Sequence, residues 1–447
     1  MPDPSTAADR RAAELDQADL LARFRDEFHL PAGQVYFDGN SLGPLSRRAE
    51  AHLRRVVDEW RTLGISGWTE ASPPWLSLSE TIAEKLAPLV GAAPDEVAVT
   101  GSTTANLHQL LATLFDPQME AGLPVPHSAR GTDSPASKQR NVIVADELNF
   151  PSDLHALASH LRKRGLDPAG HLRLIRSRDG RTLGVEDILA AFTPDVQLAV
   201  LPTVLFTSGQ LLDVATLARA AHARGILLGL DCSHSIGVVP HAFDRDGVDF
   251  AFWCNYKYLN AGPGSVGALY LNRRHFGRAP GLAGWWGGRR ERQFALSAHH
   301  EPAPDATALH IGTPHLLSLA PLLGSLEIVA AAGGAGALRT KSLALTAFLM
   351  ELVDRELAGL GFVLANPRAG HERGGHVALA HPEAWRICQA LKSAGVVPDF
   401  RPPDVIRLAP APLYTRFADC AAVVTRLGEI MRTRAYEKFP AETALVT

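Results

Sequence analysis

Apolar residues follow two alternating patterns between residues 97 and 271. Short apolar runs recur at 97–99, 142–145, 172–175, 198–202, 226–230, 250–253 and 266–271. Several of them are separated by segments whose apolar residues recur every three or four positions, for example residues 103–114. This alternation predicts an α/β domain with a mostly parallel seven-stranded sheet that helices cover on both faces. Ligands of such sheets bind at the carboxyl ends of the strands.

Helical patterns dominate the flanking segments. We expect helices over residues about 10–30, 46–62 and 75–91. Beyond residue 338 the pattern predicts one more helix and then strand, helix, strand and strand, which together form a small α+β domain. The small-residue segment 330–337 is compatible with a linker and equally with tight packing within or beside a helix.

These patterns divide the chain into three parts. We expect residues 1–65 to form an N-terminal segment that packs on the small domain, 66–325 to form the large domain, and 326–447 to form the small C-terminal domain. A chain of 447 residues, 46% of them hydrophobic, is long enough for two cores. Residues 116–140 are rich in Pro, Ser, Gly and charge, and we expect them to form a surface excursion from the large domain.

Charge and cysteine content argue against several classes of protein. The 44 basic and 47 acidic residues are intermixed and give a net charge of -3, so we expect no nucleic-acid partner. None of the four cysteines forms a CxxC or Cys/His pair at metal-ligand spacing, so we expect reduced thiols and no metal site. The polar N-terminus carries no apolar signal core, and no apolar run approaches the roughly 20 residues of a membrane helix. We therefore expect a cytoplasmic protein without a membrane partner.

Candidate chemistry lies where predicted strands end. Asp231 follows the run at 226–230, His234 comes three residues later, and Lys257 follows the run at 250–253. Only seven of the 44 basic residues are lysine. Arginine cannot lose its proton and act as an amine nucleophile, whereas lysine can. A lysine placed beside a buried strand in this arginine-rich chain is therefore a candidate nucleophile.

A phosphate site is predicted at the start of the helix at 103–114. The run at 97–99 leads through Gly-Ser-Thr-Thr directly into this helix. Free backbone N–H groups and the positive end of the helix dipole make such an N-terminus a cradle for phosphate. A phosphate cradle, a carboxylate and a lysine together match pyridoxal 5'-phosphate (PLP), whose pyridine nitrogen pairs with an acid and whose aldehyde bonds a lysine. Taken separately, each feature also has an ordinary use as a helix cap, a turn residue or a surface charge.

The sequence resembles the kynureninases, the PLP-dependent hydrolases of tryptophan breakdown, over nearly its whole length. The matching segments are "YFDGNSLG", "TTANLHQLL", "NFPSDLHAL", "DCSHSIGVVPH", "NYKYLNAGPGS", "GWWG", "IGTP" and "RLAPAPLYTRF". The resemblance implies fold type I, the aminotransferase-like fold of PLP enzymes. It also implies hydrolysis of L-kynurenine or 3-hydroxy-L-kynurenine to anthranilate or 3-hydroxyanthranilate and L-alanine. The long 116–140 excursion, a second Trp where Phe is expected in "GWWG", and "DCSH" in place of "DLAH" leave the substrate preference open.

The resemblance also implies roles for the residues that match. The catalytic residues would be Lys257, which forms the Schiff base, Asp231, which pairs with the pyridine nitrogen, and Tyr256, which reaches the phosphate and transfers protons. Other cofactor contacts would come from Thr103, Thr104, Phe150, Asp153 and His234. Substrate contacts would come from Arg407, which clamps the α-carboxylate, and from Trp68 and Asn40. Trp285 and Thr313 would reach the phosphate of the neighbouring subunit, which implies a homodimer with shared sites.

Two other interpretations use the same residues. The first is a cysteine desulfurase-like or epimerase-like enzyme of the same fold. A desulfurase needs a cysteine on a mobile loop, whereas Cys388 and Cys420 lie in predicted helices. The second is a non-catalytic PLP-binding regulator, a class that carries a DNA-binding module, and this chain shows no basic segment of that kind.

Overall fold

A seven-stranded sheet forms the centre of the large domain in the computed structural model, which describes residues 7–117 and 140–442. In the order in which they lie across the sheet, its strands are β2 (Val97–Ala98), β8 (Ala268–Leu271), β7 (Phe250–Trp253), β6 (Leu227–Asp231), β5 (Val196–Pro202), β3 (Val142–Asp146) and β4 (Leu172–Ile175). Neighbours from β7 to β4 run parallel, and β8 is antiparallel to both β7 and β2. The seven predicted apolar runs correspond to these strands, so the predicted sheet is confirmed.

Alternate residues of the central strands face two different hydrophobic cores. In β3, Val142 and Val144 belong to one buried cluster, whereas Ile143 and Ala145 belong to the other. Successive side chains of a strand point to opposite faces, so a strand that is buried on both faces is a continuous apolar run. Helices α5 (Thr103–Leu114) and α6 (Pro151–Lys163) pack on one face. Helices α4 (Leu78–Val90), α8 (Val185–Ala191), α9 (Val214–His222) and α12 (Leu316–Ala331) contribute to the core on the other face.

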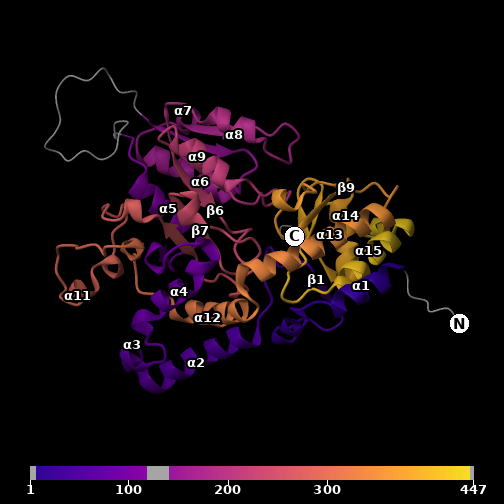
Figure 1. The fold of residues 1–447 in the computed structure, drawn as a ribbon, viewed down its shortest axis with the longest axis horizontal. Coiled ribbons are helices and arrows are strands. Elements are labelled where there is room, and N and C mark those ends of the chain that lie inside the picture. The colour runs from indigo at the N-terminus through magenta and orange to yellow at the C-terminus, as the bar shows by residue number, and fades with distance from the viewer. Residues whose placement is uncertain (1–6, 118–139, 443–447) are drawn as a thin grey trace.

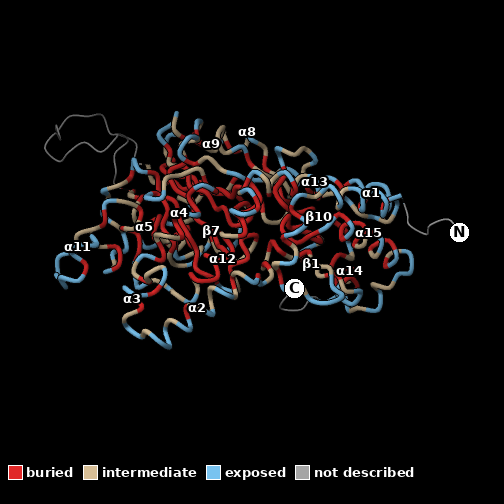
Figure 2. The backbone as a smooth tube through the Cα atoms, turned by 60° about the horizontal axis from the view of Figure 1, so that its bottom comes forward, coloured by how far each residue is buried: buried red, intermediate tan, exposed pale blue. Residues whose placement is uncertain are grey.

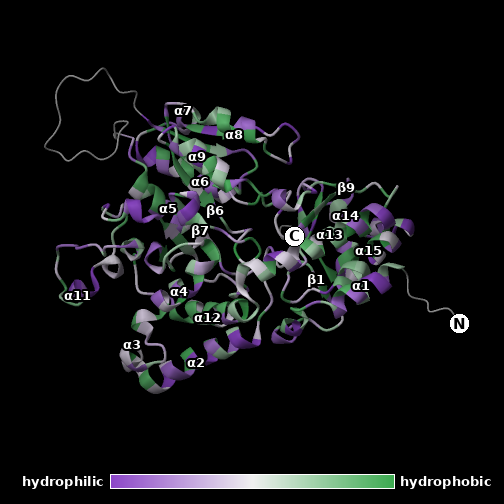
Figure 3. Cartoon of the chain, viewed as in Figure 1, coloured by the Kyte–Doolittle hydropathy of each residue, from purple (hydrophilic) through white to green (hydrophobic). Residues whose placement is uncertain are grey.

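The small domain is built on a four-stranded antiparallel sheet with the order β12-β13-β10-β9. Its strands are β9 (Val363–Leu364), β10 (Val377–Ala380), β12 (Asp399–Arg401) and β13 (Val405–Leu408). Its helices are α13 (Gly334–Glu356), α14 (Ala384–Ser393) and α15 (Phe417–Arg432), which enclose a core of their own. Figure 1 shows this domain beside the large one, and the buried and apolar segments fill the interior of both (Figures 2 and 3).

The N-terminal segment contacts both domains. Helix α1 (Ala7–Gln17) packs on α15, and β1 (Val35–Tyr36) pairs with β11 (Val396–Val397). Helix α2 (Arg47–Leu63) packs instead along α12 of the large domain.

The helix predicted over 10–30 is interrupted. Helix α1 ends at Gln17, and only a 3-10 turn follows at Ala22–Glu27. Asp19 lies in the interruption, where its carboxylate accepts a hydrogen bond from the backbone N–H of Leu21 and pairs with Lys341 at 2.6 Å. A buried ion pair with a distant helix thus replaces the helical continuation, and the apolar periodicity of the segment contained no sign of it.

The small-residue segment 330–337 lies at the change from one domain to the other. Helix α12 ends at Ala331 and α13 begins at Gly334, and the two helices are bent by 75°. Gly333 occupies the left-handed region with φ of +94°, a conformation that glycine adopts without strain. No single helix in the described parts of the chain is long and apolar enough to cross a bilayer, and only this bent pair reaches that length. Most of the predicted 116–140 excursion lies outside the described residues.

Candidate active site

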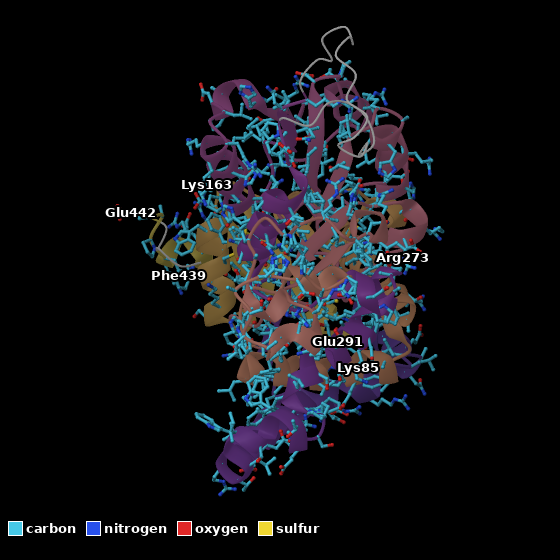
Figure 4. All side chains as sticks on the ribbon, turned by 90° about the vertical axis from the view of Figure 1, so that its left-hand side faces the viewer. Lys85, Lys163, Arg273, Glu291, Phe439 and Glu442 are labelled. Carbon is cyan, nitrogen blue, oxygen red and sulfur yellow. The ribbon has the colours of Figure 1, made fainter. Side chains whose placement is uncertain are left out.

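The carboxyl ends of β6 and β7 open into one pocket. Asp231 is the last residue of β6, and Lys257 follows the end of β7 by four residues, so parallel neighbours bring both to the same sheet edge. The pocket has a volume of about 310 Å³. It is lined by Asn40, Ser41, Ser102, Thr103, Thr104, Phe150, Ser152, Asp153, Phe206, Asp231, Ser233, His234, Tyr256, Lys257, Gly264, Ser265 and Arg401. Figure 4 shows the described side chains on the ribbon, with the labelled Lys163 and Arg273 toward opposite edges of the view.

Lys257 is hydrogen-bonded to His234. Its Nζ lies 2.8 Å from Nε2 of His234. Burial, and next the positive charge of Lys257, hold the pKa of His234 well below its usual range. The imidazole is therefore neutral, and its Nε2 accepts a hydrogen bond from the lysine.

Two acids line the wall beside the lysine. Oδ1 of Asp231 accepts a hydrogen bond from the backbone N–H of Ser233 at 2.8 Å. Asp153 lies in the first turn of α6, where burial and then the charge of Asp231 raise its pKa well above the usual range. Burial and the neighbouring carboxylate of Asp231 therefore both favour the neutral form of Asp153.

The N-terminus of α5 forms a second wall. Ser102 is the N-cap, and Thr103 and Thr104 are the first two helical residues. The hydroxyl of Thr104 lies 2.7 Å from that of Ser152 at the start of α6. Hydroxyl groups and free backbone N–H groups therefore converge at the positive end of a helix, an arrangement that binds anions.

Aromatic side chains cover part of the pocket. Phe150, immediately before α6, is 43% exposed although it is a large apolar residue. Phe206 packs edge-on against it, with ring centroids 5.4 Å apart and an interplanar angle of 89°. The pocket therefore offers an aromatic face to a planar ligand.

The loop that carries the lysine is held by the N-terminal segment. The backbone N–H of Gly43 donates to the carbonyl of Tyr256 at 2.8 Å. A Cβ atom on Gly43 would lie 2.5 Å from the carbonyl oxygen of Lys257. Gly43, the second glycine of "GNSLG", is therefore needed for the close approach of the two segments. Tyr256 itself lines the pocket, and burial, followed by the neighbouring Cys254, raises its pKa.

Arg407 lies behind the pocket rather than in its lining. Its side chain is fully buried. Its Nε donates to Asp399, its Nη1 donates to the carbonyl of Phe206 at 2.6 Å, and its Nη2 donates to Ser41 at 3.0 Å. Arg401 lies beside it and does line the pocket. Asn40 also lines the pocket, and its side-chain amide has no hydrogen-bond partner among the described residues.

Besides Arg407, three more of the predicted residues lie outside the lining of this pocket. Trp68 packs against Trp75 and Trp286, with ring centroids 6.0 and 5.5 Å away. Trp285 is 45% exposed. Thr313 is exposed and lines a separate hollow beside the start of α5. The structure thus places Asn40 in one pocket with the residues that were expected to contact the cofactor of their own chain. Trp68, Trp285 and Thr313 are not part of this pocket.

The sequence interpretation missed Ser41, Phe206, Ser233, Ser265 and Arg401 as pocket residues. Ser41 and Ser233 are direct neighbours of Asn40 and His234, so proximity to the motifs was an available signal. Phe206 and Arg401 belong to no motif that carries chemistry. Their place in the pocket depends on packing between segments far apart in the chain.

The residues present fit PLP. Several buried polar atoms of the pocket wall have no partner among the described residues, namely Oδ2 of Asp153, Oγ of Ser233 and Oγ of Ser265. Buried polar groups in folded proteins are usually hydrogen-bonded, so these atoms indicate a polar ligand. The lysine suits an aldehyde, the acid pair a pyridine nitrogen, the aromatic face a planar ring, and the α5 N-terminus a phosphate.

Comparison with known proteins supports the same assignment. A family model described as the kynureninase C-terminal domain matches residues 338–427. The kynureninase of Geobacillus thermodenitrificans is 52% identical over 435 residues, which cover 97% of this chain and 97% of the relative. The kynureninase of Shouchella clausii is 48% identical over 435 residues, with 97% of each chain covered.

Solved structures with the same fold are more distant in sequence. The cystine C-S lyase C-DES, in complex with cysteine persulfide, has a TM-score of 0.74 at 19% identity and covers 89% of this chain and 98% of its own. A C-DES mutant with glycine covalently linked to its PLP cofactor has a TM-score of 0.73 at 18% identity and covers 89% and 97%. The Escherichia coli cysteine desulfurase CsdA has a TM-score of 0.74 at 17% identity and covers 94% and 99%. These likenesses concern the fold.

Proposed function

The chain belongs to the kynureninase family, and on that premise we propose that it hydrolyses the Cβ–Cγ bond of L-kynurenine or 3-hydroxy-L-kynurenine. The products are anthranilate or 3-hydroxyanthranilate and L-alanine. The family predicted from the motifs is confirmed, as is fold type I, the fold of PLP-dependent enzymes. The protein is a PLP-dependent hydrolase of a carbon–carbon bond.

One observation carries this proposal beyond family membership. Lys257 and Asp231 line the same pocket as the N-terminus of α5, so the three groups that PLP requires are within reach of one ligand. When bound, PLP supplies an electron sink for bonds broken at the substrate Cα. Asp231 would pair with its pyridine nitrogen, Thr103 and Thr104 would hold its phosphate, and Lys257 would bond its aldehyde.

The residues of the pocket then have distinct tasks. With PLP and substrate bound, the amine of Lys257 would be the base that takes the proton from the substrate Cα. Neutral His234 holds this amine through its hydrogen bond. Tyr256 acts as the proton-transfer group beside the γ-carbonyl. Arg407 supplies positive charge for the α-carboxylate.

Bond breaking consumes one water molecule. Its oxygen adds to the γ-carbonyl carbon, and the Cβ–Cγ bond breaks with its electron pair on Cβ. Cγ leaves as the carboxylate carbon of the anthranilate product, and Cβ takes a proton and becomes the methyl group of alanine. The overall reaction is a hydrolysis and requires no oxidant.

We further propose that the protein acts in the cytoplasm as a homodimer. Trp285 and Thr313 are exposed and lie outside the pocket of their own chain. This position suits contacts with the phosphate in the partner's site. A place in tryptophan breakdown, including routes toward NAD biosynthesis, would follow from the substrate, and we propose no nucleic-acid or membrane partner.

The proposal is tested with the purified enzyme loaded with PLP. Both substrates are supplied in turn, and the aromatic product and alanine are identified by mass spectrometry. Lys257→Ala should abolish turnover. It should also abolish the covalent attachment of PLP to the protein that is detected after reduction with borohydride. The matched control is Lys85→Ala, a change at an exposed lysine of α4 that should leave both unchanged. Steady turnover by Lys257→Ala would refute the assignment.

A desulfurase activity is the main alternative within this fold. It requires a cysteine that accepts sulfur from the substrate. All four cysteines of the chain are described and buried, and none of them lines the pocket. Formation of persulfide from L-cysteine, without release of anthranilate from kynurenine, would favour this alternative.

A further inference from the structure

The pocket presents an arginine that the motifs did not assign. Asp399 and Arg401 are two residues apart on β12, so their side chains project from the same face of the strand. Asp399 is paired across the sheet with Arg407 on β13. The hairpin therefore places one carboxylate between two guanidinium groups.

The two arginines differ in exposure. Arg407 is fully buried, and each of its three nitrogens already has a protein acceptor. The side chain of Arg401 is 28% exposed and lines the pocket. Its Nε donates to Asp399 at 3.0 Å and its Nη2 to Ser41 at 3.4 Å. Its Nη1 has no acceptor among the residues that the structure describes.

The charges in the pocket leave Arg401 available for an anion. The charged side chains of the lining are Asp153, Asp231, Lys257 and Arg401. Lys257 is required by the cofactor, Asp231 is assigned to the pyridine nitrogen, and Asp153 interacts electrostatically with both Asp231 and Lys257. The cofactor phosphate has its own place at the N-terminus of α5, on a different domain from Arg401. The remaining anionic group of an amino-acid substrate is its α-carboxylate.

We propose that Arg401 is a substrate-binding residue that contacts the α-carboxylate directly, in front of the buried Arg407. This assignment rests on the proposed function and specifies how its pocket recognises amino acids. Asp399 accepts hydrogen bonds from both guanidinium groups through their Nε atoms, which leaves Nη1 of Arg401 available to a ligand. A guanidinium group with two free N–H donors matches the geometry of a carboxylate.

The test compares Arg401→Gln and Arg401→Lys with Arg181→Gln. Arg181 is a matched control because its side chain is 30% exposed and pairs with Asp404 of the same hairpin, yet it does not line the pocket. Arg401→Gln should raise KM for L-kynurenine by about 10- to 100-fold, the loss expected for a charge-assisted hydrogen bond. Arg401→Lys should recover part of this loss, and Arg181→Gln should behave as wild type.

Two further measurements identify the group that Arg401 contacts. Kynuramine, which lacks the carboxylate, should inhibit wild type and Arg401→Gln equally. The dissociation constant of PLP should be the same in both proteins. A weaker PLP affinity at unchanged KM would assign Arg401 to the phosphate, and an equal loss for kynuramine would assign it to another part of the substrate. Either result would overturn the proposal, as would an unchanged KM.

Binding of L-alanine separates this proposal from the proposed function. Its affinity is read from the cofactor absorbance and requires no hydrolysis. If wild type did not cleave kynurenine, the proposed function would fail. A weaker affinity for L-alanine in Arg401→Gln than in Arg181→Gln would still support a carboxylate contact at Arg401. Equal affinities in the two variants would refute the role of Arg401 in either case.

Discussion

Nζ of Lys257 lies 2.8 Å from Nε2 of His234, and both side chains line the pocket that we assign to PLP. The pKa of His234 is held well below its usual range, by burial and by the lysine's charge, so the imidazole acts as an acceptor. Nδ1 of the same ring is buried and has no partner among the described residues. The lysine is therefore positioned by a neutral base instead of by a carboxylate.

This hydrogen bond predicts unequal effects of two substitutions. His234→Phe removes the acceptor and should lower kcat by about 10-fold or more, because the amine of Lys257 loses its orientation. His234→Gln keeps an acceptor and should lose less. The yield of the lysine–cofactor bond trapped by borohydride should also be lowest in His234→Phe and intermediate in His234→Gln. Equal behaviour of both variants and wild type would show that His234 does not position the lysine.

A second prediction concerns Gly43, which packs against the lysine loop. In Gly43→Ala the new methyl group would lie 2.5 Å from the carbonyl oxygen of Lys257 and 2.1 Å from Oδ1 of Asn260. The loop must shift, so kcat should fall by about 10-fold or more while the enzyme remains folded. Gly170→Ala is the control, since a Cβ there meets nothing within 4 Å. Steady-state kinetics and circular dichroism check both expectations, and full activity of Gly43→Ala would contradict the first.

The third prediction is a pH dependence that arises from Asp38. Burial, followed by the charge of Asp399, raises the pKa of Asp38 to about 7, although Ser41, Arg407 and Arg401 act in the opposite direction. Other titratable groups that interact with it are Tyr36, Tyr258, Tyr414 and Cys388. Above pH 7 an ionised Asp38 adds negative charge beside the proposed carboxylate site. Affinity for L-alanine should therefore decrease as pH rises through about 7.

The comparison with Asp38→Asn isolates this effect, because the amide cannot ionise. The ratio of the two affinities for L-alanine should change between pH 6 and 8 and become constant on either side. The contribution of Asp38 to folding stability changes in the same direction as the affinity and decreases as pH rises. A raised pKa in the folded state contributes stability that is complete below the unfolded pKa near 4 and is lost as pH rises through about 7. A constant affinity ratio across this range would exclude Asp38 as the source.

The fourth prediction concerns stability and Asp249, which joins β6 to the loop after β8. Its carboxylate accepts hydrogen bonds from the backbone N–H of Leu228 at 2.8 Å and pairs with His275 at 2.7 Å and His222 at 3.0 Å. Burial alone would raise the pKa of Asp249, but the two histidines and Arg274 outweigh burial and lower it. Its contribution is thus present above the unfolded pKa near 4 and is lost as pH falls below that value.

Asp249→Ala should lower the free energy of unfolding by about 3–5 kcal/mol at pH 7, because it leaves buried partners unpaired. Asp58→Ala is the control, since Asp58 forms an exposed pair with Arg61 and should cost less than about 0.5 kcal/mol. Urea denaturation of the two variants and wild type provides the comparison. Equal losses would show that the buried cluster contributes nothing beyond a surface pair.

The fifth prediction tests the proposed shared sites. Lys257→Ala and Trp285→Ala should each be inactive or nearly so as homodimers. After subunit exchange in an equal mixture, half of the dimers are hybrids with one intact site, so activity should recover to about a quarter of wild type. Sites built from a single chain would give no recovery. Activity before exchange provides the baseline, and light scattering reports the oligomeric state.

Much of the fold was predictable because its signals are local. The central strands are buried on both faces, so each appears as an apolar run, as β3 does with Val142 and Ile143 facing different cores. Asp231 and Lys257 were predictable because parallel strands place their carboxyl ends at one edge. The interruption after Gln17 was not predictable, since it depends on the pairing of Asp19 with Lys341.

The sequence by itself determined the order of strands and helices, the family, the cofactor and the two residues at the strand ends. Only the tertiary structure decided which arginine faces the pocket. Arg407 is buried by Asp399 of its own hairpin, by Phe206, 201 residues away, and by Ser41, 366 residues away. Periodicity and motifs depend on neighbours along the chain, whereas the exposure and partners of a side chain depend on segments that only folding brings into contact.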